Sequence, residues 1–357
     1  MAPVIRLLEA SDHFTHTLIV TGQHRELLDQ VLDLFALKPA HDLNIMQEGQ
    51  QLDEILARTL SRLGEILRAE RPGCVLVHGD TTSTLSGALA AFYNRIPVGH
   101  VEAGLRTCDR FQPYPEEMNR RLADELTDYY FCPTPGAAAN LRREGLTDGE
   151  IIITGNTVVD AVNLVLEMQP EIPEAPREFI GRFPEYVVVT AHRRENWGEP
   201  LQRIGNGIAG FAHANPQVGV IICLHPNPVL RGGLEPLVGA EPNVLLAPAL
   251  SYAPFVHLMH GARFILTDSG GIQEEACSLG KFVLVLRERT ERPEAVDAGF
   301  ARVIGTRAGS IVSQMEGALA GTMEGKIPPA DTPNPFGDAH AADLIVEFLQ
   351  TKLGQIG

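Results

Sequence analysis

Three carboxylates stand where the chain turns after apolar runs that are typical of buried strands. Asp80 follows the run 75–78, Glu102 follows the run 96–101, and Glu116 ends the polar loop after Glu102. Carboxylates that lie close together suit proton transfer. They also suit a metal ion, but the ligand spacing of a known metal motif is absent from this stretch. The stretch therefore predicts a site that moves a proton.

Each acid also has a purely structural interpretation. Asp80 could cap a helix that starts at Thr81, and Glu116 could complement the dipole of a helix that it begins. Acids at two strand ends and a third in the next loop are harder to explain together in this way. In open α/β sheets, ligands bind outside the carboxyl ends of the strands. We therefore expect Asp80, Glu102 and Glu116 to line one site.

Strand and helix patterns alternate around these acids. In the first half we expect helices at 2–10, 23–32, 50–69, 81–93, from about 116 and at 135–144, and strands at 16–21, 75–78, 96–101, 128–133 and 151–156. The pattern restarts with strands at 186–190, 219–224, 244–247, 264–267, 282–286 and 302–304. This predicts an α/β fold of two Rossmann-like, doubly wound domains, 1–165 and 185–357, joined by a proline- and acid-rich linker over 166–184.

The stretch 264–276 reads as a strand, a two-glycine turn and the start of a helix. Backbone N–H groups at a helix N-terminus bind anions, and Gly270 and Gly271 would let a phosphate approach closely. Ser269 adds a hydroxyl donor, and Glu275 has the chemistry to accept hydrogen bonds from ribose hydroxyls. The alternative is an ordinary tight turn. We expect the stretch to bind a nucleoside diphosphate.

Cationic and imidazole groups follow two further strands of the second half. His192 and Arg193 come after the strand at 186–190, and His225 comes after the next strand. A lone histidine is usually structural, but two at successive strand ends are better candidates for a site. Arg292 either adds charge there or faces solvent. A diphosphate site in one half and acids in the other suggest chemistry on a sugar attached to a nucleotide.

The composition limits the partners. A chain of 357 residues with 44% hydrophobic and 21% charged residues is typical of a globular protein long enough for two domains. The net charge of −16 argues against nucleic acid or an anionic membrane as a main partner. The first residues have the pattern of neither a signal peptide nor a membrane span. The five cysteines form no close pair, so we expect buried thiols in a reducing, cytoplasmic compartment.

Taken together, these motifs resemble the non-hydrolysing UDP-N-acetylglucosamine 2-epimerases of bacteria. The resemblance spans essentially the whole chain and is carried by residues 23–26, 78–82, 100–106, 115–117, 192–195, 268–276 and 290–294. It implies a fold similar to the B-type glycosyltransferases, with a deep cleft between two domains and a last helix that crosses back to the first. It also implies a homodimer, and a reaction that needs neither metal nor nicotinamide cofactor.

The reaction that the resemblance implies interconverts UDP-N-acetylglucosamine and UDP-N-acetylmannosamine. The proton on carbon 2 is removed and UDP is eliminated to give a glycal; UDP then adds back with the proton on the other face. By the resemblance, Asp80, Glu102 and Glu116 are the catalytic acids, with base and acid unassigned among them, and His192 aids the departing UDP. The substrate contacts implied are Leu250 and Phe255 for uracil, Glu275 for ribose, and Ser269, Gly270, Gly271 and Arg292 for the diphosphate.

The sequence departs from the family pattern in two places. Family members begin with a strand and a loop reading Gly-Thr-Arg-Pro-Glu-Ala-Ile-Lys before the residues that match 1–3, and both are missing here. We expect Met1 to be a misassigned internal start, which an intact mass of the native protein would test. Some relatives are activated by their own substrate at a neighbouring site, which is matched here by Gln23, Gln50, Arg193 and His225. Glu26 and Gly49 replace a Gln and an Arg of those relatives, which leaves such activation open.

Three other activities fit the same pattern. A hydrolysing 2-epimerase would release UDP and free N-acetylmannosamine. A glycosyltransferase would require an acceptor. A nucleotide-sugar binding protein would hold the same ligand without turnover, and the missing loop favours that alternative.

Overall fold

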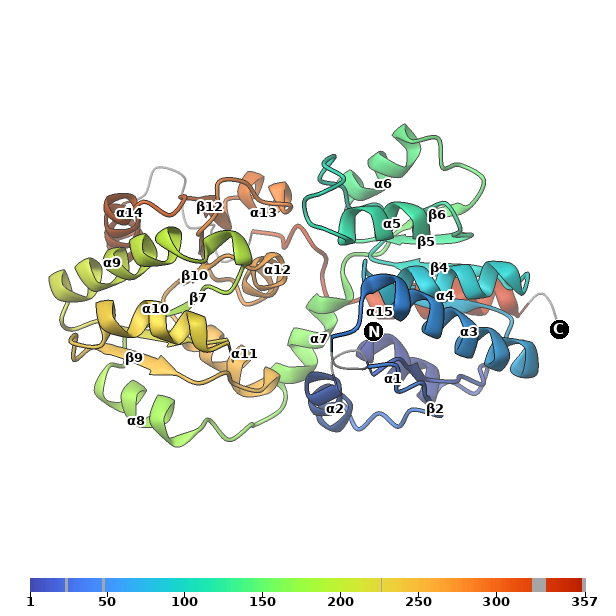
Figure 1. The fold of residues 1–357 in the computed structure, drawn as a ribbon, viewed down its shortest axis with the longest axis horizontal. Coiled ribbons are helices and arrows are strands. Elements are labelled where there is room, and N and C mark those ends of the chain that lie inside the picture. The colour runs from blue at the N-terminus through green and yellow to red at the C-terminus, as the bar shows by residue number, and fades with distance from the viewer. Residues whose placement is uncertain (23–24, 47–48, 226, 323–331, 355–357) are drawn as a thin grey trace. The chain divides into compact units, whose positions relative to one another are not determined.

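The computed structural model describes residues 1–22, 25–46, 49–225, 227–322 and 332–354. The chain forms two compact units, Met1–Ala161 with Gly337–Gly357 and Val162–Phe336 (Figure 1). Strands in each unit pair in parallel, and helices alternate with them along the chain. The predicted α/β fold with two Rossmann-like units is confirmed.

The first unit is built on a parallel sheet of four strands in the order β3-β4-β5-β6. Its strands are β3 (Val75–His78), β4 (Val98–Val101), β5 (Tyr129–Cys132) and β6 (Glu150–Ile153). A separate parallel pair is formed by β1 (Ile19–Val20) and β2 (His41–Asp42). The helices are α1 (Ala2–Ala10), α2 (Arg25–Leu34), α3 (Leu52–Glu70), α4 (Thr82–Tyr93), α5 (Glu116–Asp124), α6 (Pro135–Arg143) and α15 (Ala341–Leu353), and the units part within α7 (Thr157–Leu166).

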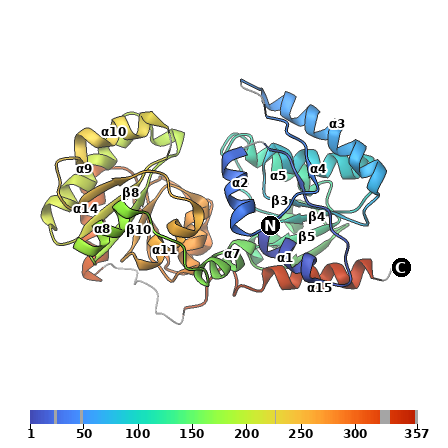
Figure 2. The same ribbon diagram turned by 90° about the horizontal axis from the view of Figure 1, so that it is seen from below.

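The last helix of the chain, α15, belongs to the first unit and packs beside α1 (Figures 1 and 2). The contact is apolar, with Val4 and Ile345 both fully buried in one cluster. The start of α15 is fixed by Asp160, whose Oδ1 accepts a hydrogen bond of 2.9 Å from the Ala342 amide. This bond satisfies one of the free N–H groups that every helix N-terminus leaves.

The second unit is built on a parallel sheet of six strands in the order β12-β11-β10-β7-β8-β9. Its strands are β7 (Tyr186–Thr190), β8 (Gly219–Cys223), β9 (Val244–Ala247), β10 (Ile265–Thr267), β11 (Val283–Val285) and β12 (Ala301–Val303). Its helices are α8 (Glu174–Arg182), η1 (Arg194–Asn196), α9 (Glu199–Ala214), α10 (Pro228–Val238), α11 (Tyr252–Gly261), α12 (Gly270–Ser278), α13 (Pro293–Asp297) and α14 (Ala308–Ala320). The strand order reverses between β7 and β10, and ligands of doubly wound sheets bind outside the strand ends at that switch point.

The division of the chain differs from the predicted one. The predicted linker contains a helix, α8, because Pro176 and Phe179 form a buried face that the surrounding acids and prolines obscured in the sequence. Residues from Gly337 onward belong to the first unit, so the expected crossing of the last helix back to the first domain is confirmed. The strand predicted at 16–21 is only two residues long, and Cys108 is exposed, unlike the buried thiol that was expected.

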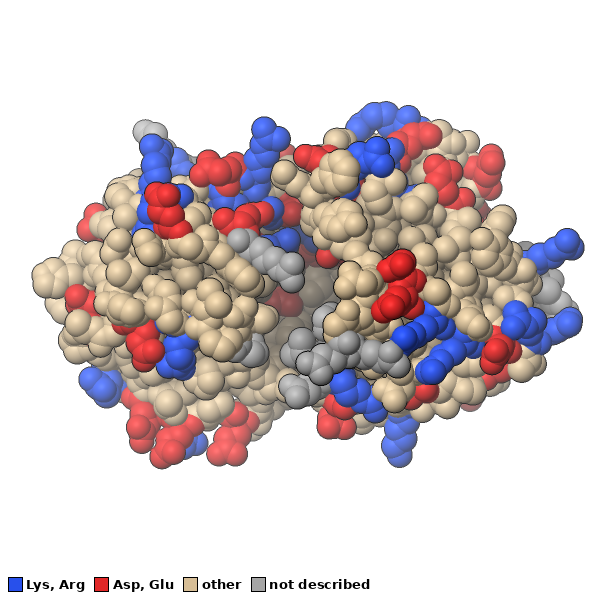
Figure 3. Space-filling view, viewed as in Figure 1, with Lys and Arg blue, Asp and Glu red and all other residues tan. Residues whose placement is uncertain are grey.

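The surface carries charges of both signs. On the face drawn in Figure 3, acidic and basic side chains are interspersed. No helix in the described part of the chain has the length and apolar character that crossing a bilayer requires. The five cysteines are all free thiols.

Candidate functional site

Asp80 lies in the turn between β3 and α4. Its carboxylate does not cap α4, because the N-cap is Thr81, whose Oγ1 accepts a hydrogen bond of 3.3 Å from the Thr84 amide. Asp80 Oδ2 instead accepts a hydrogen bond of 2.7 Å from Nη2 of Arg120. The side-chain amide of Asn119 donates to the Asp80 carbonyl over 3.0 Å, so α5 binds this turn twice. The capping interpretation of Asp80 is therefore wrong.

Glu102 follows β4 in a left-handed backbone conformation, with a φ of 69°. Such conformations cost a residue other than glycine of order 1–3 kcal/mol and cluster at functional sites. Its Oε1 accepts a hydrogen bond of 3.3 Å from the side-chain amide of Asn156, and its Oε2 lies 3.7 Å from His78 Nε2. A Cβ atom at Gly79 would lie 3.2 Å from the same Oε2. The structure thus brings Glu102 to the turn that carries Asp80.

Glu116 is the first residue of α5, the helix that binds the Asp80 turn. Its Oε2 is buried and has no hydrogen-bond partner among the described residues. The next residue, Glu117, is fully buried and accepts hydrogen bonds of 3.0 and 3.3 Å from the amides of Thr107 and Cys108. Glu117 therefore fixes the loop before α5. Glu116 Oε2 makes no hydrogen bond of this kind.

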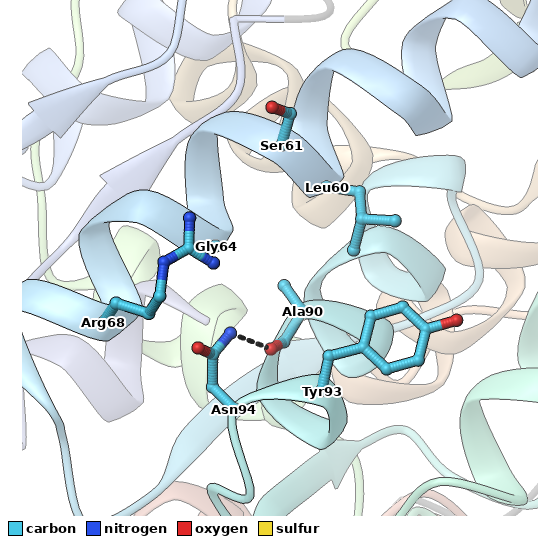
Figure 4. Close-up of a pocket in the computed structure, with 7 residues that line it drawn as sticks. All are labelled: Leu60, Ser61, Gly64, Arg68, Ala90, Tyr93 and Asn94. Atoms are coloured by element: carbon cyan, nitrogen blue, oxygen red, sulfur yellow. Dashed lines mark hydrogen bonds between the residues drawn. The ribbon is translucent and has the colours of Figure 1, made fainter.

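A surface pocket of about 260 Å³ opens between α3 and the end of α4, away from these acids (Figure 4). Within it, the Asn94 side chain donates a hydrogen bond of 2.7 Å to the Ala90 carbonyl. The lining residues are Leu60, Ser61, Gly64, Arg68, Ala90, Tyr93 and Asn94. Asp80, Glu102 and Glu116 do not line the pocket, so it is a different feature from the predicted site.

In the second unit, Asp268 anchors the loop that carries His192. Asp268 directly follows β10 and is fully buried. Its Oδ2 accepts hydrogen bonds of 3.0 and 2.9 Å from the amides of His192 and Arg193, and one of 2.8 Å from the Asn196 side chain. His192 follows β7, the strand beside β10. His192 therefore lies at the switch point of the sheet, where a ligand is expected.

The two predicted histidines of this unit lie together. The rings of His192 and His225 stack with their centroids 6.0 Å apart and their planes at 15°. His192 Nδ1 also lies 3.3 Å from Asp268 Oδ1. Burial and the charges of Arg193 and His225 lower the pKa of His192, although Asp268 opposes them. A neutral imidazole can still donate one hydrogen bond to a ligand.

The start of α12 gathers donors for an anion. The helix begins after Ser269, whose side chain makes no capping hydrogen bond. A Cβ atom at Gly270 would lie 3.7 Å from Arg292 Cζ, and one at Gly271 would meet nothing within 4 Å. The Arg292 guanidinium also pairs with the buried Glu274. A helix N-terminus beside a guanidinium and a serine hydroxyl has the chemistry of a pyrophosphate site.

Glu275, one turn into α12, is linked to the start of α11 through a hydrogen bond with Tyr252. Burial raises the pKa of Glu275 to about 8; the Tyr252 hydrogen bond opposes this and the charge of Glu274 adds to it. Leu250 and Phe255 flank Tyr252 in the sequence, and both are half-buried. The residues predicted for ribose and uracil therefore lie on neighbouring elements.

The residues predicted for activation by substrate lie in different parts of the chain. Gln23 is outside the described residues, and Gln50 is a half-buried residue of the first unit, just before α3. Arg193 and His225 both lie beside His192 in the second unit. A regulatory site formed by these residues stays a prediction.

The sequence assigned no role to four residues that position the candidate residues: Arg120 and Glu117 in the first unit, and Asp268 and Asn196 in the second. Asp268 had a usable signal, because it directly follows a buried strand as Asp80 does. Arg120 and Glu117 had only their spacing of three residues on a helix, which is common on surfaces. In the part of the chain that the structure describes, no group of three or more His, Cys, Asp or Glu side chains is arranged to hold a metal ion.

Comparison with known proteins tests the resemblance. The family model described as UDP-N-acetylglucosamine 2-epimerase matches residues 6–350. The chain belongs to the UDP-N-acetylglucosamine 2-epimerase family. Among members of this family, the UDP-N-acetylglucosamine 2-epimerase of Salmonella typhimurium is 46% identical over 358 residues, covering 98% of this chain and 95% of that protein. The enzyme of Neisseria meningitidis serogroup A is 45% identical, with the same two coverages.

Solved structures of the epimerase family agree with the fold. The crystal structure of the Neisseria meningitidis enzyme bound to UDP-GlcNAc has a TM-score of 0.89 and 44% identity, covering 98% of this chain and 96% of that chain. The Methanocaldococcus jannaschii enzyme in complex with UDP-GlcNAc and UDP has a TM-score of 0.81 and 33% identity, covering 98% and 95% of the two chains. Family membership and fold therefore rest on matches over nearly the whole chain.

Proposed function

We propose that this chain interconverts UDP-N-acetylglucosamine and UDP-N-acetylmannosamine without hydrolysing them. The observation that carries the proposal is the gathering of acids at the Gly79–Asp80 turn, in a chain of the epimerase family. Glu102 reaches this turn from β4, and α5, which starts at Glu116, binds it through Arg120. Paired acids at one point are what inversion at carbon 2 requires, because one proton leaves and another returns.

The proposed reaction has two steps. A carboxylate of the first unit takes the proton from carbon 2. The bond between carbon 1 and the diphosphate oxygen breaks, and a carbon–carbon double bond forms. UDP leaves with the electron pair of the broken carbon–oxygen bond, and the electron pair of the carbon–hydrogen bond becomes the double bond. The double bond then takes a proton on its opposite face at carbon 2, while the diphosphate oxygen bonds again to carbon 1. Asp80, Glu102 and Glu116 supply the proton acceptor and donor.

The second unit binds and stabilises UDP in this scheme. The amides at the start of α12, with Ser269, Gly270 and Gly271, bind the diphosphate, and Arg292 adds a cation beside them. The same donors stabilise the negative charge that grows on departing UDP, as preorganised dipoles do in transition states. His192 donates a hydrogen bond to the diphosphate. Glu275 binds ribose, and Leu250 and Phe255 enclose uracil.

Product analysis separates this proposal from its competitors. Purified protein is incubated with UDP-N-acetylglucosamine alone, and the products are followed by phosphorus and proton NMR. The proposal expects UDP-N-acetylmannosamine at a constant total of UDP-sugar. Stoichiometric UDP and free N-acetylmannosamine would assign a hydrolysing epimerase. An unchanged substrate, together with UDP binding by calorimetry, would assign a binding protein or a glycosyltransferase that lacks its acceptor.

We also propose that this chain forms a homodimer in the cytoplasm. The five free thiols fit a reducing compartment, in which disulfides are rare, and the proposed nucleotide-sugar substrate fits the same compartment. Light scattering coupled to gel filtration would measure the oligomeric state. A mass of twice 38.8 kDa is expected, and a mass equal to one chain would contradict the dimer.

A further inference from the structure

His100 is a fully buried histidine in β4 that the proposed reaction does not use directly. Its Nδ1 lies 2.7 Å from Asp124 Oδ1, and its Nε2 lies 2.8 Å from the Gly79 carbonyl oxygen. The other oxygen of Asp124, Oδ2, accepts a hydrogen bond of 2.7 Å from Arg106 Nη1. Because a carboxylate and a carbonyl can only accept here, both ring nitrogens of His100 must donate. The ring is therefore an imidazolium.

The charges around the ring are consistent with this state. Burial alone lowers the pKa of His100, but the charge and hydrogen bond of Asp124, the Gly79 carbonyl and the charge of Glu102 together raise it. Burial lowers the pKa of the neighbouring His78 well below its usual value, and the charge of His100 lowers it further. The pKa values of His100 and His78, two histidines near Glu102, are therefore shifted in opposite directions.

The position of His100 connects the segments that carry all three acids. Gly79 directly precedes Asp80, and Glu102 follows His100 by two residues in the same chain segment. Asp124 is the last residue of α5, the helix that begins with Glu116. One ring therefore joins the end of β3, the end of β4 and α5.

We propose that His100 is a positioning residue for the epimerisation, whose imidazolium holds the Gly79 carbonyl, and with it the Asp80 turn, against α5. The inference rests on the proposed function, since it concerns the acids of that reaction. It predicts that the hydrogen bond to Gly79 matters for turnover, whereas the hydrogen bond to Asp124 matters for folding.

Two substitutions separate the two hydrogen bonds. In His100→Asn the side-chain amide nitrogen takes the place of Nδ1, so it can donate to Asp124 but cannot reach the Gly79 carbonyl. In His100→Gln the amide nitrogen takes the place of Nε2, so it can donate to Gly79 and leaves Asp124 to Arg106. Both variants lose the buried cation, so the loss of that charge by itself would affect them alike. His213→Asn, at an exposed position of the second unit, is the control substitution.

Steady-state kinetics of the full-length variants test the proposal. We expect His100→Asn to lower kcat about tenfold or more relative to His100→Gln, because small misplacements of catalytic groups cost up to a hundredfold. KM and the Kd for UDP should stay unchanged in both variants. Equal kcat values in the two folded variants would overturn the proposal. Absence of epimerisation in the wild type would instead overturn the proposed function, so the two failures are distinguishable.

A measurement on the wild-type protein keeps the test valid if either variant does not fold. Nitrogen-15 NMR of histidine-labelled protein reports whether both ring nitrogens carry a proton. We expect one buried histidine, identified through its contacts with Gly79, to remain doubly protonated at pH 7.5. A singly protonated His100 would overturn the proposal.

Discussion

Arg120 Nη2 lies 2.7 Å from Asp80 Oδ2, so a buried cation of α5 orients the acid that ends β3. Nη1 of the same guanidinium lies 3.4 Å from Oε2 of the buried Glu117. The ion pair is therefore shared between an acid proposed for the reaction and an acid that only holds the loop before α5. Removing the cation should disturb both the reaction and the folding.

We expect Arg120→Met to lower kcat about tenfold to a hundredfold, because Asp80 loses the group that orients it. The free energy of unfolding should fall by about 3–5 kcal/mol, as it does when one partner of a buried ion pair is removed. Kinetics and urea unfolding measure the two effects. Arg121→Met, on the exposed side of the same helix, is the control and should change neither quantity much. A folded Arg120→Met variant with wild-type kcat would show that Asp80 needs no such partner.

A substitution at Gly79 tests whether Glu102 has to approach the Asp80 turn closely. Gly79 has a φ of 71°, and a Cβ atom there would lie 3.2 Å from Glu102 Oε2. Gly145 has a φ of 82° with nothing within 4 Å of its Cβ position. Alanine at either position should cost about 1–2 kcal/mol of stability, because both backbones are left-handed. We expect only Gly79→Ala to lower kcat, by about tenfold; equal kcat values in the two variants would contradict this.

Glu275 should make the stability of the folded protein depend on pH. Its pKa in the folded protein is raised to about 8 from an ordinary value of 4.5, with burial as the main cause. Between those two values the folded protein holds a proton that the unfolded chain has released, so stability falls as the pH rises through this window. Glutamine does not titrate. We therefore expect the Tm of Glu275→Gln, relative to the wild type and without UDP, to be higher at pH 8 than at pH 5.

The control for this prediction is Glu316→Gln, at an exposed position of α14. Its Tm relative to the wild type should be the same at both pH values. If the Tm difference between Glu275→Gln and the wild type does not change with pH, this carboxyl titrates alike in the folded and unfolded chain.

The sequence was sufficient to predict features that depend on local patterns. Asp80, Glu102 and the turn at Gly270 were predicted because each follows a buried apolar run, and parallel strands end at the same edge of a sheet. The helix at 174–182 was not predicted, because its buried face consists of little more than Pro176 and Phe179.

The partners of the predicted residues could not be read from the sequence. Arg120 is 40 residues from Asp80, and Asp268 is 76 residues from His192. Local spacing carries no information about such pairs, because the fold alone brings them together. His100 illustrates the same limit: its position in a strand was predicted, but its charge follows from two acceptors that lie on other segments.

In the proposed reaction, the acids of the first unit move the proton on carbon 2 of a UDP-sugar. The most direct test is turnover of UDP-N-acetylglucosamine in deuterium oxide, followed by mass spectrometry and NMR of the recovered UDP-sugars. We expect one deuterium at carbon 2 with the wild type, and none with a folded, UDP-binding Glu102→Gln variant. Glu125→Gln, at an exposed position just after α5, should behave as the wild type. Epimerised product without deuterium at carbon 2 would show that this proton is not exchanged, and wild-type exchange in Glu102→Gln would show that Glu102 does not move it.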